Sequence, residues 1–285
     1  MLLSRKPVGR VSIVTPGGLP VEADVVDACI GEGCAQCAVR KDAGDDADVT
    51  DGVLVYARVE HAGSGTGAAG SKGVPAREAE VSVDGGVGVG RVTLPGLEQP
   101  VGAAAINATP RAMIASAVRE VCAAHGSSGN IAVTISVPEG VALAEKTFNP
   151  HLGIEDGISI LGTTGIVEPR SLAALRDSIE LEIRQHAAMG RRGVVLTPGN
   201  YGEQFISGHF HLNGAPVVVI SNFVGDAIDC CVREGFTNVL LVGHIGKLVK
   251  VAGGIMDTHS RTADCRAEIL AAHAALAGAG AKTVR

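Results

Sequence analysis

Apolar and polar positions follow two different patterns along the chain, and the change falls near residue 150. In residues 10–62, short β-rich runs alternate with turn signals such as Pro16-Gly17-Gly18, which is typical of hairpins. The predicted strands are 11–15, 21–26, 35–39, 53–59 and 80–83. Residues 107–124 have apolar side chains at helical spacing, and a strand at 131–137 follows. We therefore predict an α+β domain over residues 1–150.

After residue 157 the apolar runs no longer alternate, and each is followed by a glycine- or asparagine-bearing turn and a helix. The predicted strands are 158–161, 194–196, 217–220 and 239–242, and the turns are 162–165, 198–202, 221–223 and 243–246. Helices are clearest at 171–189 and 224–233. Continuous apolar strands separated by helices indicate a parallel sheet covered on both faces. Residues 151–285 are therefore predicted to form an α/β three-layer domain with a largely parallel sheet.

Composition narrows the class of protein. The 285 residues are 46% hydrophobic, as expected of a folded chain. Apolar stretches such as 217–220 are far below the roughly 18 residues of a membrane span, and the first residues do not resemble a secretory signal, so a cytoplasmic protein without membrane partners is expected. A net charge of −6, without Trp and with two Tyr and five Phe, argues against nucleic-acid binding. Homo-oligomerisation stays open.

The seven cysteines are expected to be reduced thiols rather than a disulfide framework. Cys34 and Cys37 form one C-x-x-C, but no second pair follows at a zinc-like spacing, so no metal site is predicted. His209 and His211 would share a face if their segment is a strand, which suits a metal clamp or a solvated edge. A literal G-x-G-x-x-G at 65–70 opens no helix, so a dinucleotide fingerprint is rejected.

The turns at the carboxyl ends of the predicted parallel strands are where ligands bind in open sheets. Helix N-termini there offer free backbone N–H groups to an anion, and glycine lets a ligand approach closely. The alternative is that these turns need Gly, Asn and Ser only to turn and cap. His259, near Asp257 and Asp264, is either an acid/base group or part of a hydrogen-bonded loop.

Several longer stretches, taken in order, carry a family resemblance. They are 41–52, 88–96, 105–111, 144–150, GISILGTTGIVEP at 157–169, PGNYG at 198–202, SNFVGD at 221–226, LVGHIGKLVK at 241–250 and AGGIMDTHSR at 252–261. From about residue 10 to 270 the chain resembles the CbiD-type family of cobalt-precorrin-5B C(1)-methyltransferases. Relative to that family, N- and C-terminal segments are expected to be absent.

The resemblance implies methyl transfer from S-adenosylmethionine to C1 of cobalt-precorrin-5B, giving cobalt-precorrin-6A in anaerobic cobalamin biosynthesis. Cobalt enters only as part of this tetrapyrrole substrate. The sulfonium already activates the methyl group, so the enzyme mainly aligns the reactants and excludes water. A noncatalytic corrinoid or nucleotide binder on the same scaffold is the alternative. A nicotinamide oxidoreductase ranks behind, because no fingerprint turn is present.

Candidate site residues follow from the matching motifs and the strand-end geometry. Those expected at the methyl donor are Thr163, Thr164, Gly165, Glu168, Gly199, Asn200, Tyr201, Gly202, Asn222 and Asp226, with Glu168 or Asp226 on the ribose or amino group. Those expected at the substrate are Lys146, Arg170, Gly243, His244, Gly246, Lys247, Lys250, His259, Ser260 and Arg261. His244 and His259 are the candidate catalytic groups. A Gly165→Asp substitution is expected to weaken donor binding in calorimetry.

Overall fold

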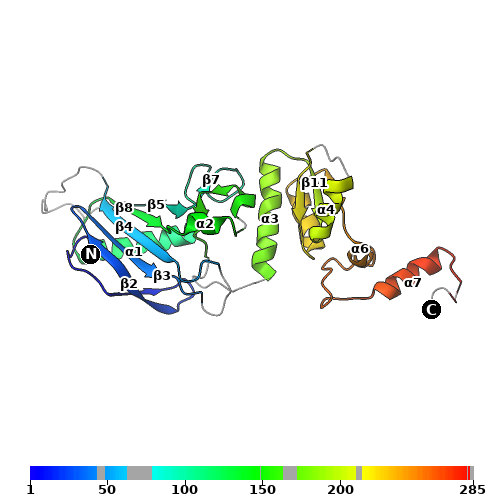
Figure 1. Ribbon diagram of the computed structural model, residues 1–285, viewed down its shortest axis with the longest axis horizontal. Coiled ribbons are helices and arrows are strands. Elements are labelled where there is room, and N and C mark those ends of the chain that lie inside the picture. Colours follow the sequence, from blue (N-terminus) through cyan, green and yellow to red (C-terminus); the bar gives the residue numbers. More distant parts are fainter. Residues whose placement is uncertain are drawn as a thin grey trace. The chain divides into compact units, whose positions relative to one another are not determined.

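The computed structural model describes residues 1–43, 49–62, 79–147, 149–162, 172–209, 214–280 and 282. Its contacts divide the chain into two compact units, Met1–Pro169 and Arg170–Arg285 (Figure 1). Each unit has a hydrophobic core of its own. No helix within the described ranges is long and apolar enough to cross a bilayer.

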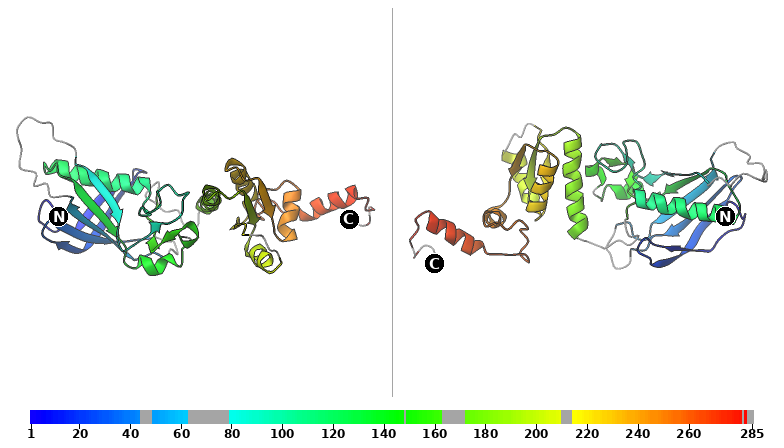
Figure 2. Two further views of the ribbon diagram at one scale, coloured as in Figure 1. Left: turned by 90° about the horizontal axis from the view of Figure 1, so that it is seen from above. Right: turned by 180° about the vertical axis from the view of Figure 1, so that it is seen from behind.

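The first unit is built on a six-stranded sheet of order β1-β2-β3-β4-β8-β5. Its strands are β1 (Arg10–Val14), β2 (Pro20–Ile30), β3 (Cys34–Arg40), β4 (Leu54–His61), β8 (Ile131–Ser136) and β5 (Val81–Gly85). The neighbours from β1 to β8 are antiparallel, and β5 is parallel to β8. Helix α1 (Ala108–Ala124) lies along the sheet (Figure 2) and packs Ile114, Val118 and Cys122 onto the core. The predicted hairpins and helix are confirmed.

Two short pairs of strands, rich in glycine, complete the first unit. Strand β6 (Gly88–Val89) pairs in parallel with β10 (Gly157–Ile158), and β7 (Arg91–Val92) pairs with β9 (Ile154–Glu155). Helix α2 (Gly140–Ala144) and the 3-10 turn η1 (Asn149–Leu152) lie between them in sequence. Gly88 has φ +75°, and a Cβ there would overlap the Val137 carbonyl, so only glycine fits without backbone movement.

The predicted strand at 158–161 is therefore wrong in its place and extent. β10 ends at Ile158 and pairs with β6 of the first unit, not with the sheet of the second. An apolar run of four residues does not specify which strand it pairs with. Here the partner strand is set by the close approach of Gly88 and Gly157.

The second unit contains a three-stranded parallel sheet of order β12-β11-β13. The strands are β11 (Gly193–Thr197), β12 (Val217–Val219) and β13 (Asn238–Leu241). Its helices are α3 (Leu172–Ala188), α4 (Asn200–His209), α5 (Val224–Arg233), α6 (Ile245–Ala252) and α7 (Arg266–Leu276). The core joins Ile183 of α3, Leu196 and Val218 of the sheet, and Val224 of α5. The fold class is thus mixed α/β.

His209 is the last residue of α4. The idea that it belongs to a strand shared with His211 is therefore wrong for His209, and His211 lies outside the described residues. In the helix, His209 stacks on Phe205 with 4.4 Å between the ring centroids, an i,i+4 contact on one helix face.

Candidate functional site

A pocket of about 610 Å³ opens where the three parallel strands of the second unit end. Pro198 follows β11, Asn222 follows β12, and His244 follows β13. The lining residues are Pro198, Tyr201, Gly202, Asn222, His244, Gly246, Lys247, Lys250, Thr258, His259, Ser260 and Arg266. All but Pro198, Thr258 and Arg266 were expected from the sequence. We call this the cationic pocket.

Two histidines of the cationic pocket are fixed by their own loops. His244 is the N-cap of α6, where its Nδ1 accepts the Gly246 N–H at 3.1 Å. The Nδ1 of His259 accepts the Arg261 N–H at 3.1 Å. A neutral imidazole that accepts at Nδ1 carries its proton on Nε2. In this arrangement both rings offer an Nε2–H donor rather than a basic lone pair.

The two lysines of the pocket have different environments. Lys250 is 3% exposed, donates to the Thr258 and Ala263 carbonyls at 3.2 and 2.7 Å, and lies 3.7 Å from Asp264 Oδ1. It tethers the segment after α6. Lys247 donates to the Ser221 carbonyl at 3.2 Å, and burial followed by the charge of Lys250 lowers its pKa.

Asp257 joins the turn after β12 to the loop that contains His259. Its carboxylate accepts from the Asn222 side chain at 2.9 Å, the His259 N–H at 3.0 Å and the Thr262 hydroxyl at 3.1 Å. The Thr258 N–H also donates to the Asn222 carbonyl at 3.0 Å. Burial acts to raise the pKa of Asp257, but the hydrogen bonds outweigh it and leave that pKa below its ordinary value. Asp257 is therefore a positioning residue for one wall of the pocket.

Thr258 and Arg266 were missed by sequence reasoning. Thr258 is 4% exposed, and its hydroxyl has no hydrogen-bond partner within the part of the chain that the structure describes. Such a buried hydroxyl costs about 1–3 kcal/mol. Arg266, the first residue of α7, is paired with Asp264, with 2.6 Å between Nε and Oδ1. Thr258 lies within the stretch 252–261 that carries the family resemblance, and the spacing Asp264-x-Arg266 is the signal for Arg266.

Other expected site residues lie elsewhere. Lys146 belongs to the first unit, in the turn after α2. Asp226 is in the first turn of α5, and its carboxylate is 3.1 Å from Arg176 Nε. Gly199 and Arg261 adjoin the cationic pocket in sequence but are not among its described lining residues, and Asn200 is the first residue of α4. Thr163, Thr164, Gly165, Glu168 and Arg170 lie outside the described residues.

A smaller hollow of about 370 Å³ adjoins the cationic pocket and shares Tyr201, Gly202 and His244 with it. Its other lining residues are Phe205, Val242, Gly243 and Ile245. Tyr201 is 83% exposed, and Phe205 and Ile245 are also exposed. We call this the apolar hollow, because large uncharged side chains dominate it.

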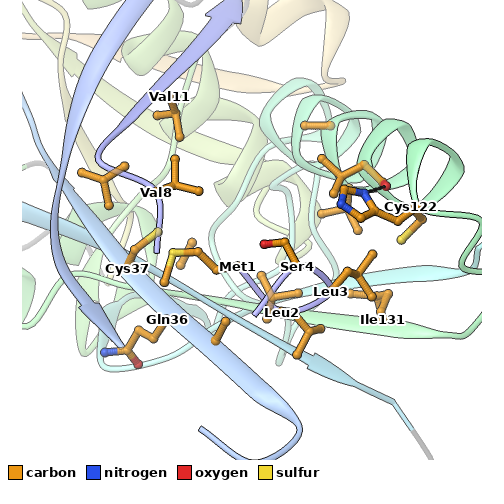
Figure 3. Close-up of a pocket in the computed structure, with 18 residues that line it drawn as sticks. Met1, Leu2, Leu3, Ser4, Val8, Val11, Gln36, Cys37, Cys122 and Ile131 are labelled. Atoms are coloured by element: carbon orange, nitrogen blue, oxygen red, sulfur yellow. Dashed lines mark hydrogen bonds between the residues drawn. The ribbon is translucent and has the colours of Figure 1, made fainter. Parts of the chain in front are cut away.

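The first unit has a separate apolar pocket of about 500 Å³ between the sheet, α1 and the first residues of the chain. Figure 3 shows Met1, Leu2 and Leu3 among its lining, together with Cys37 and Cys122. Burial is the main cause that raises the pKa of both thiols. No Lys, Arg, Asp or Glu is among the described residues that line it, so no lysine or arginine side chain is there to pair with a carboxylate.

A mixed α/β fold with a pocket at the carboxyl ends of parallel strands is an arrangement that α/β proteins use to bind small ligands, and the cations in the lining suit an anionic one. A family model described as CbiD matches residues 1–169, and one described as the CbiD C-terminal domain matches residues 257–285. The chain belongs to the CbiD family, which confirms the resemblance found in its sequence.

The three relatives described next share one printed name, cobalt-precorrin-5B C(1)-methyltransferase. That of Ruminiclostridium cellulolyticum is 45% identical over 284 residues, which cover 100% of this chain and 70% of the relative. That of Thermoanaerobacter sp. is 46% identical over 285 residues, covering 100% and 73%. That of Edwardsiella ictaluri is 46% identical over 279 residues, covering 98% and 69%.

A solved structure, the cobalamin biosynthesis protein (cbiD) from Archaeoglobus fulgidus, matches at 25% identity with a TM-score of 0.45. The match covers 93% of this chain and 78% of that one.

Proposed function

We propose that this chain is a C-methyltransferase that converts cobalt-precorrin-5B to cobalt-precorrin-6A by methylating C1. One observation carries the proposal: 45% identity over 284 residues, the whole of this chain, with a relative named for that reaction. A noncatalytic binder on the same scaffold is not favoured, because the curated relatives compared above are named as enzymes.

The methyl donor in this proposal is S-adenosylmethionine. An electron pair at C1 of the macrocycle forms the new C–CH₃ bond, the S–CH₃ bond breaks, and the sulfonium becomes the neutral thioether of S-adenosylhomocysteine. Because the methyl group is already electrophilic, the protein has to hold the two molecules in line and exclude water. A strong general base is not required, which agrees with two pocket histidines that present Nε2–H donors.

The finer fold assignment is part of the same proposal. The second unit as a three-layer α/β domain is supported by its parallel β12-β11-β13 sheet. A division into two domains at residue 150 stays a prediction, as does a cytoplasmic location. The donor-site residues between Thr163 and Glu168 also stay a prediction from the sequence.

The test is direct. The purified chain is incubated with cobalt-precorrin-5B and S-adenosylmethionine, and the tetrapyrrole is examined by mass spectrometry. We expect the mass gain of one methyl group, and a larger gain when the donor carries a trideuterated methyl. An unmodified tetrapyrrole, with both ligands shown to bind, would instead support the noncatalytic binder.

A further inference from the structure

We infer that the cationic pocket and the apolar hollow together hold the macrocycle of the substrate, and that S-adenosylmethionine binds elsewhere. The inference rests on the proposed function and assigns its two ligands. It differs from the expectation from the sequence, which placed Tyr201, Gly202 and Asn222 at the methyl donor.

The first argument is the charge of the cationic pocket. Lys247, Lys250 and Arg266 line it, and none of its described lining residues is Asp or Glu. Asp264 pairs with both Lys250 and Arg266, and Lys250 is buried, so Lys247 is the cation with which a ligand carboxylate can pair. S-adenosylmethionine carries an ammonium and a sulfonium against one carboxylate, so its net charge is positive. A donor site therefore needs acidic or acceptor groups, whereas this lining repels a cation and attracts carboxylates.

The second argument is the kind of hydrogen-bonding group on offer. His244 and His259 present Nε2–H donors, since their Nδ1 atoms are occupied by backbone N–H groups. The hydroxyl of Thr258, which has no partner within the described ranges, is a further polar group in the lining. Ionised carboxylates only accept hydrogen bonds, so a lining rich in donors fits them.

The third argument is the apolar hollow beside these donors. Tyr201, Phe205 and Ile245 are large, exposed and contiguous around it. The chain has only seven Tyr and Phe together, two and five, and one of each lies here. Exposed apolar groups gathered in one place mark a binding surface.

A corrin precursor has this combination of properties: a flat apolar ring edged by carboxylate arms. With the ring face over Tyr201 and Ile245, arms at the ring edge reach the shared rim at His244 and the Lys247 ammonium beyond it. Because the two hollows share residues, one ligand can occupy both.

The test separates the two ligands by calorimetry on the full chain, without turnover. The probes are uroporphyrin, an octacarboxylate tetrapyrrole, and S-adenosylhomocysteine. Lys247→Met removes the ammonium, Lys247→Arg keeps a cation, and Tyr201→Ser removes the exposed ring. Lys282→Met, at an exposed lysine of the same unit, is the matched control.

We expect Lys247→Met to weaken uroporphyrin binding roughly tenfold or more, as the loss of a charged hydrogen bond implies. Lys247→Arg restores most of it, Tyr201→Ser weakens it severalfold, and all variants bind S-adenosylhomocysteine as the parent does. The inference is overturned if either substitution weakens S-adenosylhomocysteine more than uroporphyrin, if neither affects uroporphyrin, or if the parent chain binds no uroporphyrin. Methyl transfer by the parent chain could still be found in each of those cases, so the proposed function is judged separately.

Discussion

Replacing either of two glycines of α4 with alanine should change the stability of the second unit, in opposite directions for the two positions. A Cβ at Gly202 would overlap Thr197 Oγ1, and it would lie 2.8 Å from Thr197 Cβ and 3.0 Å from the Val242 carbonyl oxygen. A Cβ at Gly208 meets nothing within 4 Å. Gly208→Ala should therefore gain helix propensity alone and stabilise the second unit by up to about 1 kcal/mol.

For Gly202→Ala the gain in helix propensity is smaller than the cost of steric overlap. Thr197 is fully buried and donates to the Gly199 carbonyl at 3.1 Å. Overpacking costs about 1–3 kcal/mol, and turning Thr197 away loses a hydrogen bond of about 1 kcal/mol. After subtracting the propensity gain of about 1 kcal/mol, the net destabilisation is about 1–3 kcal/mol.

The assay is amide hydrogen exchange followed by mass spectrometry, because it resolves the second unit from the first. In peptides from β11 and α4, Gly202→Ala should raise the opening constant roughly five- to 150-fold, while Gly208→Ala leaves it equal or lower. Peptides from β8 in the first unit are the internal control. If the two alanine variants shift exchange in the same direction, the steric argument is wrong.

Three further predictions concern other parts of the chain. The folded-state pKa of Asp257 is lowered, so its carboxylate stabilises the second unit above the unfolded pKa of about 3.9, and that contribution is lost as pH falls from there through the folded value. Asp257→Asn should therefore flatten the loss of exchange protection below about pH 4. An unchanged profile would contradict this. Gly88→Ala should destabilise the first unit by about 2–5 kcal/mol, from backbone strain and steric overlap together, as measured by urea unfolding followed by circular dichroism. Gly102 has φ +90° but open space around it, so Gly102→Ala should cost only about 1–2 kcal/mol. Equal costs would show that overlap with the Val137 carbonyl does not contribute. Burial is the main cause that raises the pKa of Cys231 to about 11. Because only the thiolate reacts, iodoacetamide at about pH 8 should label the exposed Cys265 far faster than Cys231. Comparable labelling of the two in peptide mapping would show that the Cys231 thiol is accessible.

The sequence predicts those parts of the fold that depend on neighbouring residues, and it does not predict specific contacts between residues far apart in the chain. Helix α5 (Val224–Arg233) was predicted to the residue, because its apolar spacing and flanking turns are local signals. The partner of β10 was not, since pairing with β6 depends on glycines far apart in the chain. Short strands such as β6 carry too few residues for any periodicity.

The candidate site shows the same division. Turns after β11, β12 and β13 were predicted to meet, because parallel strands end at one edge of a sheet. Thr258 and Arg266 join them only because the segment after α6 folds back, tethered by Lys250 to the Thr258 and Ala263 carbonyls. That tether is a tertiary contact made by a lysine that looked like a ligand for carboxylates.

The way the two pocket histidines cap their own loops has a consequence for the metal in the substrate. An imidazole that serves as an axial ligand to cobalt through Nε2 must have that nitrogen deprotonated, and its Nδ1–H then usually donates to an acceptor. His244 and His259 have the opposite arrangement, with Nδ1 accepting from backbone N–H groups. In this tautomer neither ring has a free lone pair at Nε2 for a metal, so both would act toward a bound macrocycle as hydrogen-bond donors.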